Sequence, residues 1–305
     1  AHLALTVIGE GPAEYKGTVM SGPEVLPAAG IEPLVLSAKE GLSLINGTQG
    51  MLGIGALAIH RAIMLTQTAD LTGAMTIEAL KGSVSPFDAA IVEARPHPGA
   101  LASAAHLRRL LRDSPMVASH VDCDEVQDAY SLRCMPQVHG SARDLLSYTE
   151  RVIELELDAA TDNPLVLRDG RILSGGNFHG QPVAAALDVA TMALADLASI
   201  AERRLAQLGD PSLNRGLPPF LAVNSGLNSG YMMAQVTAAS LVCESRSLCQ
   251  PKSADTIPTS ADREDHVSMG MISARHLAIV VDHLEDVLSI EAVVAQEGIR
   301  QRGVG

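Results

Sequence analysis

A chain of 305 residues is long enough for one large domain or two ordinary ones. Hydrophobic residues make up 47% of it, but aromatic residues make up only 2% and Trp is absent. Its core must therefore be built from aliphatic side chains, which favours closely packed helices over a β-sandwich. The net charge of −13 argues against binding to nucleic acid, because phosphates require a basic surface.

Cysteine usage and hydropathy indicate a cytoplasmic protein. The four cysteines, at positions 123, 134, 243 and 249, form no Cys-x-x-Cys pair, which predicts reduced thiols. The most apolar stretches, around 50–66 and 183–201, are interrupted by charged residues, so no membrane span is predicted. The ten histidines lack the spacing of metal ligands, and no metal site is predicted. Both ends of the chain look cut from something longer.

In chain order, the first long element is predicted over residues 37–80 as one very long helix. Leu42, Ile45, Leu52 and Ile59 keep near-helical spacing, and apolar residues occupy most other faces, which predicts burial on nearly all sides. An Asn-Gly pair inside this stretch would suit a hairpin turn, but its flanks lack period-two alternation. We therefore favour an uninterrupted helix.

The remaining elements are also mostly helical. A helix is predicted over 99–112, and Pro136 begins another that the Asp-Asn-Pro sequence at 162–164 ends. An Asp-Gly pair between two short apolar runs predicts one small β-hairpin near 165–174. Further helices are expected at about 182–208, 228–249 and 263–300. The prediction is an all-α, long-helix bundle that forms a single unit over 1–305 and associates, because such helices cannot bury their apolar faces within one chain.

Two helical positions carry candidate site residues. Tyr130 and Arg133, three residues apart on a helical turn, would point to the same side. A guanidinium binds a carboxylate in two-pronged fashion, and a phenol beside a fixed positive charge can take part in proton transfer. The same pair could equally cap a helix end. Asn46 places an amide in an apolar helix, where it needs partners, although one neighbouring helix would suffice.

Two loops carry further candidates. Phe178, one of only three Phe residues, follows two glycines in a turn that lacks the Gly-Lys-Ser/Thr of a phosphate loop. Such a segment is also an ordinary tight turn before a helix. Glu264 is predicted near a helix N-terminus, with Ser260 or Asp262 as the cap, in a proline-punctuated polar loop. The helix dipole would favour a carboxylate there in any case.

Together these segments resemble the histidine ammonia-lyases of the aromatic amino acid lyase family. The motifs are Asn-Gly-Thr-Gln at 46–49, Gln-Asp-Ala-Tyr-Ser-Leu-Arg-Cys at 127–134, Ser-Gly-Gly-Asn-Phe-His-Gly-Gln-Pro at 174–182 and the loop at 250–269. The resemblance runs over the whole chain, as the central helical-bundle domain of such an enzyme. It implies the ammonia-lyase/fumarase-like bundle and a homotetramer whose active sites take residues from three subunits.

The resemblance implies an elimination that converts L-histidine to trans-urocanate and ammonia, the first step of histidine degradation. Arg133 and Asn46 would hold the substrate carboxylate, and Tyr130 would assist proton transfer and cofactor polarisation. Gln127 and Phe178 would shape the cofactor side of the site.

Glu264 would engage the imidazole or the departing amine in this resemblance. An imidazole offers an N–H donor and a phenyl ring offers none, which favours histidine over phenylalanine as the substrate. Arg263 stands where members of the family mostly carry Gln. A tyrosine or phenylalanine ammonia-lyase is the first alternative.

The family forms its electrophilic cofactor, 4-methylidene-imidazol-5-one (MIO), from an Ala-Ser-Gly triplet. No such triplet occurs in these 305 residues, so we expect it to lie outside this chain, and the chain alone is expected to be inactive. The missing triplet also keeps a catalytically silent helical subunit or scaffold open as an alternative. A fumarase-like lyase is disfavoured, because its glycine-rich Ser-Ser-x-Met-Pro-x-Lys-x-Asn motif is absent.

Overall fold

The computed structural model describes residues 1–120 and 126–303, which separate into two compact units. Unit 1 combines Ala1–Gly50 with Leu157–Gly180, and unit 2 combines Met51–Glu156 with Gln181–Gly305. The sequence shows no linker that would separate domains, and one central helical-bundle domain over 1–305 stays a prediction. Unit 1 is assembled from two segments that are distant in the sequence.

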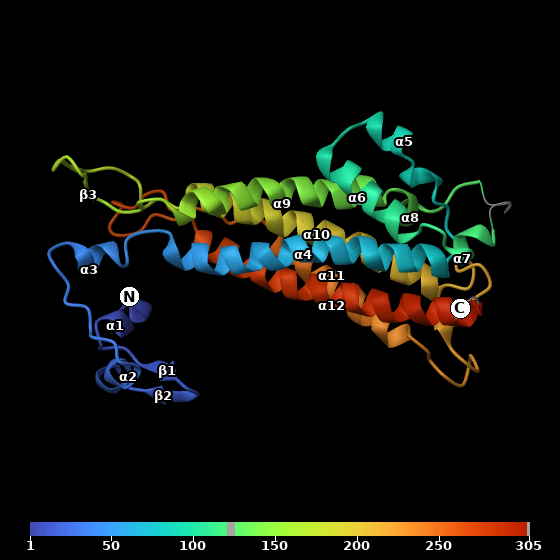
Figure 1. Cartoon of the computed structure of the whole chain (residues 1–305), viewed down its shortest axis with the longest axis horizontal. Helices are drawn as coiled ribbons and strands as arrows, with labels where there is room; N and C mark the ends of the chain where they lie inside the picture. Colours follow the sequence, from blue (N-terminus) through green and yellow to red (C-terminus); the bar gives the residue numbers. More distant parts are fainter. Residues whose placement is uncertain (121–125, 304–305) are drawn as a thin grey trace. The chain divides into compact units, whose positions relative to one another are not determined.

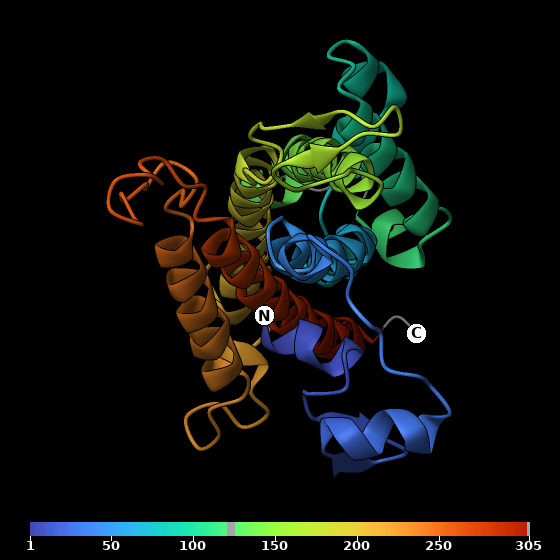
Figure 2. The same cartoon turned by 90° about the vertical axis from the view of Figure 1, so that its left-hand side faces the viewer.

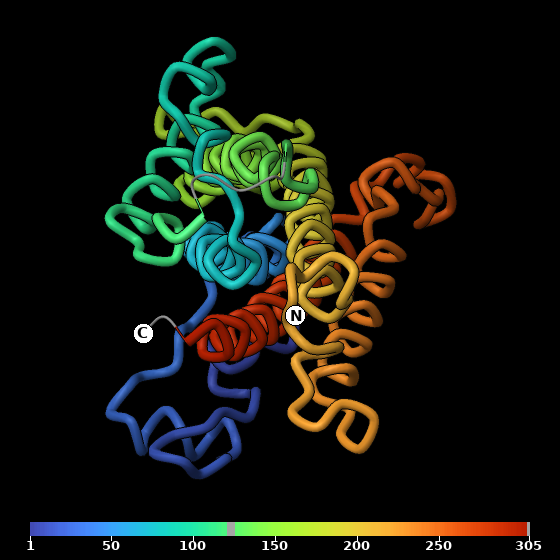
Figure 3. Tube along the Cα trace, turned by 90° about the vertical axis from the view of Figure 1, so that its right-hand side faces the viewer, coloured from blue at the N-terminus to red at the C-terminus, as the bar shows by residue number. Residues whose placement is uncertain are grey.

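Unit 2 is a bundle of long helices. α4 (Gln49–Ala79), α9 (Met135–Leu157), α10 (Gln181–Gly209) and α12 (Gly270–Arg302) run alongside one another (Figure 1 and, end-on, Figure 2). α11 (Met232–Leu248) packs along both α10 and α12, as Figure 3 shows from the other end. The shorter elements are α5 (Ala89–Glu93), α6 (Pro98–Leu110), α7 (Pro115–Ala118), α8 (Tyr130–Arg133), η1 (Ser85–Phe87) and η2 (Pro219–Leu221). The predicted all-α bundle is confirmed.

Unit 1 contains short helices and two β-hairpins. Its elements are α1 (His2–Val7), β1 (Ala13–Tyr15), β2 (Thr18–Met20), α2 (Gly22–Ala29), α3 (Glu40–Ser43), β3 (Leu165–Val166) and β4 (Ile172–Leu173). The β3–β4 hairpin, with Leu165 opposite Leu173, confirms the predicted one. The β1–β2 hairpin was not predicted; Lys16 and Gly17 both have positive φ at its tip, as a two-residue hairpin turn requires.

The prediction of one helix over 37–80 is wrong. α3 ends at Ser43 and α4 begins at Gln49, with a turn over 44–48 between them. In this turn the Asn46 side chain donates a hydrogen bond to Asp162. A Cβ on Gly47 would lie 2.5 Å from the Thr161 hydroxyl oxygen. A residue with a side chain at position 47 could not approach residue 161 so closely, which explains the glycine in the turn.

The sequence predicted that this helix would be buried on nearly all sides, but one face of α4 is exposed. Leu57, Met64 and Leu71 recur every seven residues and are 72%, 56% and 46% exposed. This spacing places them on one face of the helix. α4 therefore has a buried face toward the bundle and an apolar stripe that stays exposed among residues 1–120 and 126–303.

α10 lies in the centre of the hydrophobic core. By length and hydropathy it could cross a membrane, but 67% of its most apolar window is buried inside the protein, as in the core helix of a soluble bundle. Asp188, Glu202 and Arg204 on this helix are also buried. Cys134, Cys243 and Cys249 are free thiols, and Cys123 lies outside the described residues.

A buried ion pair joins α10 to α12. Arg204 and Glu291 are both fully buried, and the Arg204 Nε and Nη2 groups donate to the two carboxylate oxygens of Glu291 at 2.5 and 2.9 Å. The hydroxyls of Thr72 and Thr76 on α4 donate to the same carboxylate at 2.7 and 3.0 Å. Every charge of this pair is thus hydrogen-bonded, which a buried ion pair needs.

His139 of α9 extends this network to Asp70 of α4. Its Nδ1 lies 2.8 Å from an Asp70 oxygen, and its Nε2 lies 3.3 Å from Nη1 of Arg204. Because arginine only donates, Nε2 must accept and Nδ1 must carry the proton, so His139 is neutral. Burial, reinforced by the charge of Arg204, lowers the pKa of His139 against the opposing contact with Asp70.

We expect Glu291→Ala to destabilise the protein strongly, because it leaves the Arg204 guanidinium buried without its counter-ion. Breaking a buried pair in this way typically costs about 3–5 kcal/mol. Thermal unfolding at fixed protein concentration measures the effect. Glu285→Ala is the control, since Glu285 pairs with Arg61 at the surface, where ion pairs contribute about 0–1 kcal/mol. Equal shifts for both variants would contradict the assigned role.

We expect the unfolding free energy to fall as pH drops from 7 to 5, partly through His139. Its pKa is lower in the folded than in the unfolded state, so below about pH 6.5 the unfolded chain binds a proton that the folded one does not. The stability is present above that pH and is lost as pH falls, by at most about 1.4 kcal/mol per pH unit. His139→Asn keeps a donor for Asp70 without titrating, so denaturant unfolding of this variant should depend less on pH. An unchanged slope would exclude His139 as a cause.

Candidate functional site

α8 brings Tyr130 and Arg133 together, as their spacing predicted. The Arg133 guanidinium carbon lies 4.7 Å from the centre of the Tyr130 ring, a cation–π contact. Two side chains of α10 hold α8 in place: Gln207 donates to the Ser131 hydroxyl at 2.5 Å, and Arg204 donates to the Ser131 carbonyl at 3.5 Å. The buried ion pair of the bundle therefore contacts the helix that carries the candidate substrate-binding residues.

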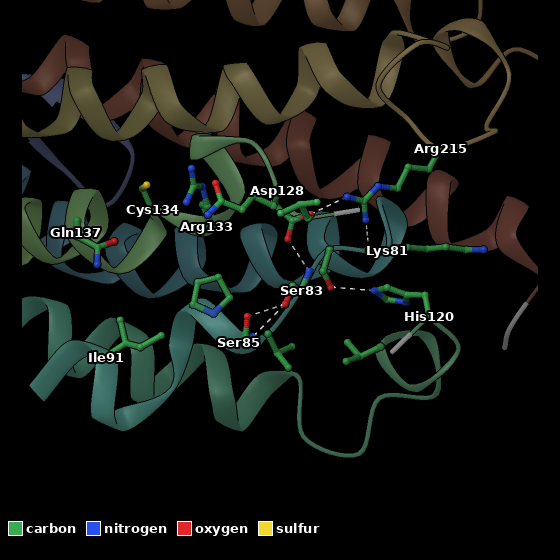
Figure 4. Close-up of a pocket in the computed structure, with 16 residues that line it drawn as sticks. Lys81, Ser83, Ser85, Ile91, His120, Asp128, Arg133, Cys134, Gln137 and Arg215 are labelled. Atoms are coloured by element: carbon green, nitrogen blue, oxygen red, sulfur yellow. Dashed lines mark hydrogen bonds and ion pairs between the residues drawn. The ribbon is translucent and has the colours of Figure 1, made fainter. Parts of the chain in front are cut away.

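Arg133 and Gln127 line a cavity of about 770 Å³ in unit 2. Figure 4 shows Arg133 and Cys134 on one wall, with Ser83 and Ser85 across from them. Three cationic side chains, those of Lys81, Arg133 and Arg215, border it, together with His120. The cavity is large enough for an amino acid, and its lining favours an anionic group.

Asp128 is the anchor of this region, and sequence analysis did not single it out. It is buried, and its carboxylate accepts from the Ser83 backbone N–H at 2.6 Å and from Arg215 Nη2 at 2.7 Å (Figure 4). It thereby joins the segment before α8 to Ser83 and Arg215, which both line the cavity. Asp128 belongs to the motif at 127–134, but its burial could not be read from the sequence.

The Arg133 guanidinium is available for a ligand. Its Nε is buried without a hydrogen-bond partner, and within residues 1–120 and 126–303 no carboxylate forms an ion pair with it. A buried donor without a partner is costly, so an anion that enters the cavity would satisfy it. Over the same residues, no group of three or more His, Cys, Asp or Glu side chains could hold a metal ion.

Glu264 lies in a loop, not in the first turn of a helix as predicted. α12 begins only at Gly270, and Ser260, Ala261 and Asp262 all have positive φ, which a right-handed helix excludes. The Thr259 hydroxyl donates to the Glu264 carboxylate at 2.6 Å. This bond, followed by one from Ser260, lowers the pKa of Glu264.

The loop over 250–269, which carries Glu264, and α8, which carries Arg133, lie at opposite ends of the unit 2 bundle (Figure 1). The loop of Glu264 is fixed where Ser253 N–H donates to Asp188, near the start of α10, whereas α8 contacts Arg204 near its end. At about 1.5 Å per residue, that stretch of α10 separates the two by on the order of 25 Å. One amino acid cannot contact both within a single chain, so a site that uses both must take them from different copies.

Asn46 and Phe178, the other two predicted site residues, belong to unit 1. Asn46 lies in the turn before α4, where its Nδ2 donates to Asp162 Oδ1 at 3.1 Å and to the Asn163 carbonyl at 3.4 Å. Phe178 is 37% exposed and follows two glycines at which an added Cβ would meet nothing within 4 Å. Both residues are thus presented on turns, with open space beside the turn that carries Phe178.

Comparison with known proteins identifies the family. A histidine ammonia-lyase from Stigmatella aurantiaca is 58% identical over 303 residues, which cover 99% of this chain and 59% of that protein. The crystal structure of a histidine ammonia-lyase from Trypanosoma cruzi has 44% identity and a TM-score of 0.89, over 98% of this chain and 57% of that one. The crystal structure of a tyrosine aminomutase from Streptomyces globisporus has 40% identity and a TM-score of 0.93, over 99% of this chain and 61% of that one. The chain thus spans about three fifths of the length of these relatives. The aromatic amino acid lyase family model matches residues 1–304, and the chain belongs to that family.

Proposed function

We propose that the protein carrying this chain is a carbon–nitrogen lyase that converts L-histidine to trans-urocanate and ammonia, the first step of histidine degradation. The relatives from Stigmatella aurantiaca and Trypanosoma cruzi, both histidine ammonia-lyases, support this substrate. The observation that carries the proposal is the buried Arg133 Nε without a partner, beside a cavity large enough for an amino acid. A guanidinium in that state is suited to the α-carboxylate of such a substrate.

The residues of this chain would bind and orient the substrate. Arg133 would fix the carboxylate, and Tyr130, whose ring lies against the guanidinium, would assist proton transfer next to it. Gln127, which lines the same cavity as Arg133, would add a hydrogen-bonding amide. Holding the carboxylate in one place turns an encounter in solution into an oriented reaction, which is a large part of what an active site supplies.

The family cofactor MIO fits the residues present. When bound it supplies an electrophile that activates the substrate for loss of ammonia. Asn46 offers an amide for a hydrogen bond to the cofactor, and Phe178 offers an aromatic face beside open space. We propose that Asn46 and Phe178 hold this group and that its Ala-Ser-Gly triplet lies outside these 305 residues.

Glu264 would select histidine. The hydrogen bonds from Thr259 and Ser260 keep its pKa low, so the side chain is an anionic acceptor at neutral pH. An imidazole N–H or the substrate amine can donate to it, whereas a phenyl ring cannot. This difference favours histidine over phenylalanine.

We propose a cytoplasmic homotetramer with active sites shared between subunits. The distance between Glu264 and Arg133 along the bundle supports shared sites, because one amino acid cannot contact both residues within a single chain. The apolar stripe of Leu57, Met64 and Leu71 on α4 supports association through the long helices, because a second helix could cover it. The free thiols at Cys134, Cys243 and Cys249 agree with a reducing compartment.

The substrate is tested by incubating the complete protein with L-histidine, L-tyrosine and L-phenylalanine. We expect ultraviolet absorbance of trans-urocanate from histidine; cinnamate or coumarate alone would defeat the proposed substrate, and no product from any of them would favour a silent scaffold.

Glu264→Ala should lower kcat/KM for histidine roughly 10- to 100-fold, as expected for the loss of a hydrogen bond to a charged group. Asp255→Ala is the control and should change little, because Asp255 is an exposed residue of the same loop that pairs with Lys252.

Shared sites are tested by mixing two variants that are each impaired. Arg133→Met and Glu264→Ala, each assembled alone, carry a defect in every site. Co-expressed, they should recover roughly a quarter of the sites with both natural residues, because random assembly lets one copy supply Arg133 and another supply Glu264. Co-expression of Arg133→Met with Arg133→Ala is the control and should recover nothing. If the first mixture is no more active than the two variants assembled alone, the two residues do not meet across subunits.

A further inference from the structure

Asp162 gathers hydrogen bonds from the turn that presents Asn46. Its carboxylate accepts from Asn46 Nδ2 at 3.1 Å and from the Ser43 hydroxyl at 2.6 Å, and it forms an ion pair with Lys39. The bonds from Lys39 and then Ser43 hold the pKa of Asp162 well below its usual range. Asp162 is therefore ionised, acts only as an acceptor, and is itself buried.

Asn163 connects the same place to the segment before Phe178. Its Oδ1 accepts from the Gly175 backbone N–H at 2.8 Å and from the Ser174 hydroxyl at 3.1 Å. Its backbone N–H donates to Asp162 at 2.7 Å, which fixes the two neighbours relative to each other. Gly175 is followed by the turn in which the His179 N–H donates to the Gly176 carbonyl, and Phe178 lies inside that turn.

The Asp162–Asn163 pair also fixes which atom Asn46 presents. An amide NH2 has two hydrogens, and Asn46 directs them at Asp162 and at the Asn163 carbonyl. The remaining polar atom of its side chain is the acceptor Oδ1. Without Asp162, the amide would be free to turn and to present its NH2 group instead, which reverses its hydrogen-bonding character.

We propose that Asp162 and Asn163 are positioning residues that orient Asn46 and the Phe178 turn for catalysis. This inference rests on the proposed function, in which Asn46 and Phe178 hold the cofactor. Asp162 sets the direction of the Asn46 amide, and Asn163 sets the start of the turn that carries Phe178. Neither touches the substrate; both act through the residue that they hold.

A double-mutant cycle in the complete protein separates positioning from general stability. Asp162→Ala should lower kcat roughly 10- to 100-fold, since small misplacements of a site group have effects of that size. Because Asp162 acts through Asn46, adding Asp162→Ala to Asn46→Ala should cause little further loss. Asp162→Asn keeps an acceptor oxygen for Asn46 and should recover part of the activity. Asp169→Ala is the control: that carboxylate pairs with Arg171 at the surface of the neighbouring hairpin and contacts neither turn.

Amide hydrogen exchange gives a readout that does not depend on the substrate. Asp162→Ala should speed exchange in peptides covering 44–48, and Asn163→Ala should speed it at Gly175, which loses its acceptor. If the protein acts on an amino acid other than histidine, the double-mutant cycle is measured with that amino acid. Failure of the proposed substrate is then distinguishable from failure of the positioning role of Asp162 and Asn163. Multiplied losses in the double variant, or unchanged exchange at 44–48 in Asp162→Ala, would overturn the proposal.

Discussion

The buried contact between Arg204 and Glu291 is the constraint on which the arrangement of the bundle depends. A guanidinium without exposed surface must find its partners at fixed positions, so α4, α10 and α12 cannot slide past one another without breaking it. His139 and Asp70 extend the constraint to α9. The apolar core alone, made largely of Ala and Leu, would tolerate several registers of the helices, because such side chains differ little in shape. Charged groups with few possible partners exclude most of them.

This constraint also reaches the site. Arg204 donates to the Ser131 carbonyl within α8, two residues from Arg133. The position of the buried Arg204 side chain therefore helps to fix α8 and, with it, the Arg133 guanidinium. Arg133 keeps an unpaired Nε, and so does Arg143, but the guanidinium of Arg143 pairs with Asp70, whereas that of Arg133 pairs with no carboxylate among the described residues. A buried guanidinium nitrogen that has no partner and belongs to a side chain lining a cavity has the arrangement of a ligand site.

Sequence reasoning succeeded where a signal is local. Helix periodicity placed α6, α9, α10 and α11 to within a few residues, and the Asp-Gly pair placed the β3–β4 hairpin. It failed where the deciding partner is distant in sequence. The turn at 44–48 exists because Asn46 bonds Asp162 and Gly47 approaches Thr161, more than 100 residues away. In the same way the spacing of Tyr130 and Arg133 was readable, but the burial of Asp128 was not.

The late start of α12 changes how Glu264 can select a substrate. In a helical first turn, the dipole would have favoured the carboxylate without any ligand. In the loop, hydrogen bonds from Thr259 and Ser260 stabilise the ionised carboxylate of Glu264. Within one copy of the chain this side chain is exposed to water. Water competes with any donor for an exposed carboxylate, so its preference for an imidazole is weak until the surroundings are dry. A neighbouring copy that brings Arg133 to the same substrate would also exclude that water. Assembly would then create specificity as well as complete the site, because the same contact supplies the second charge and removes the solvent.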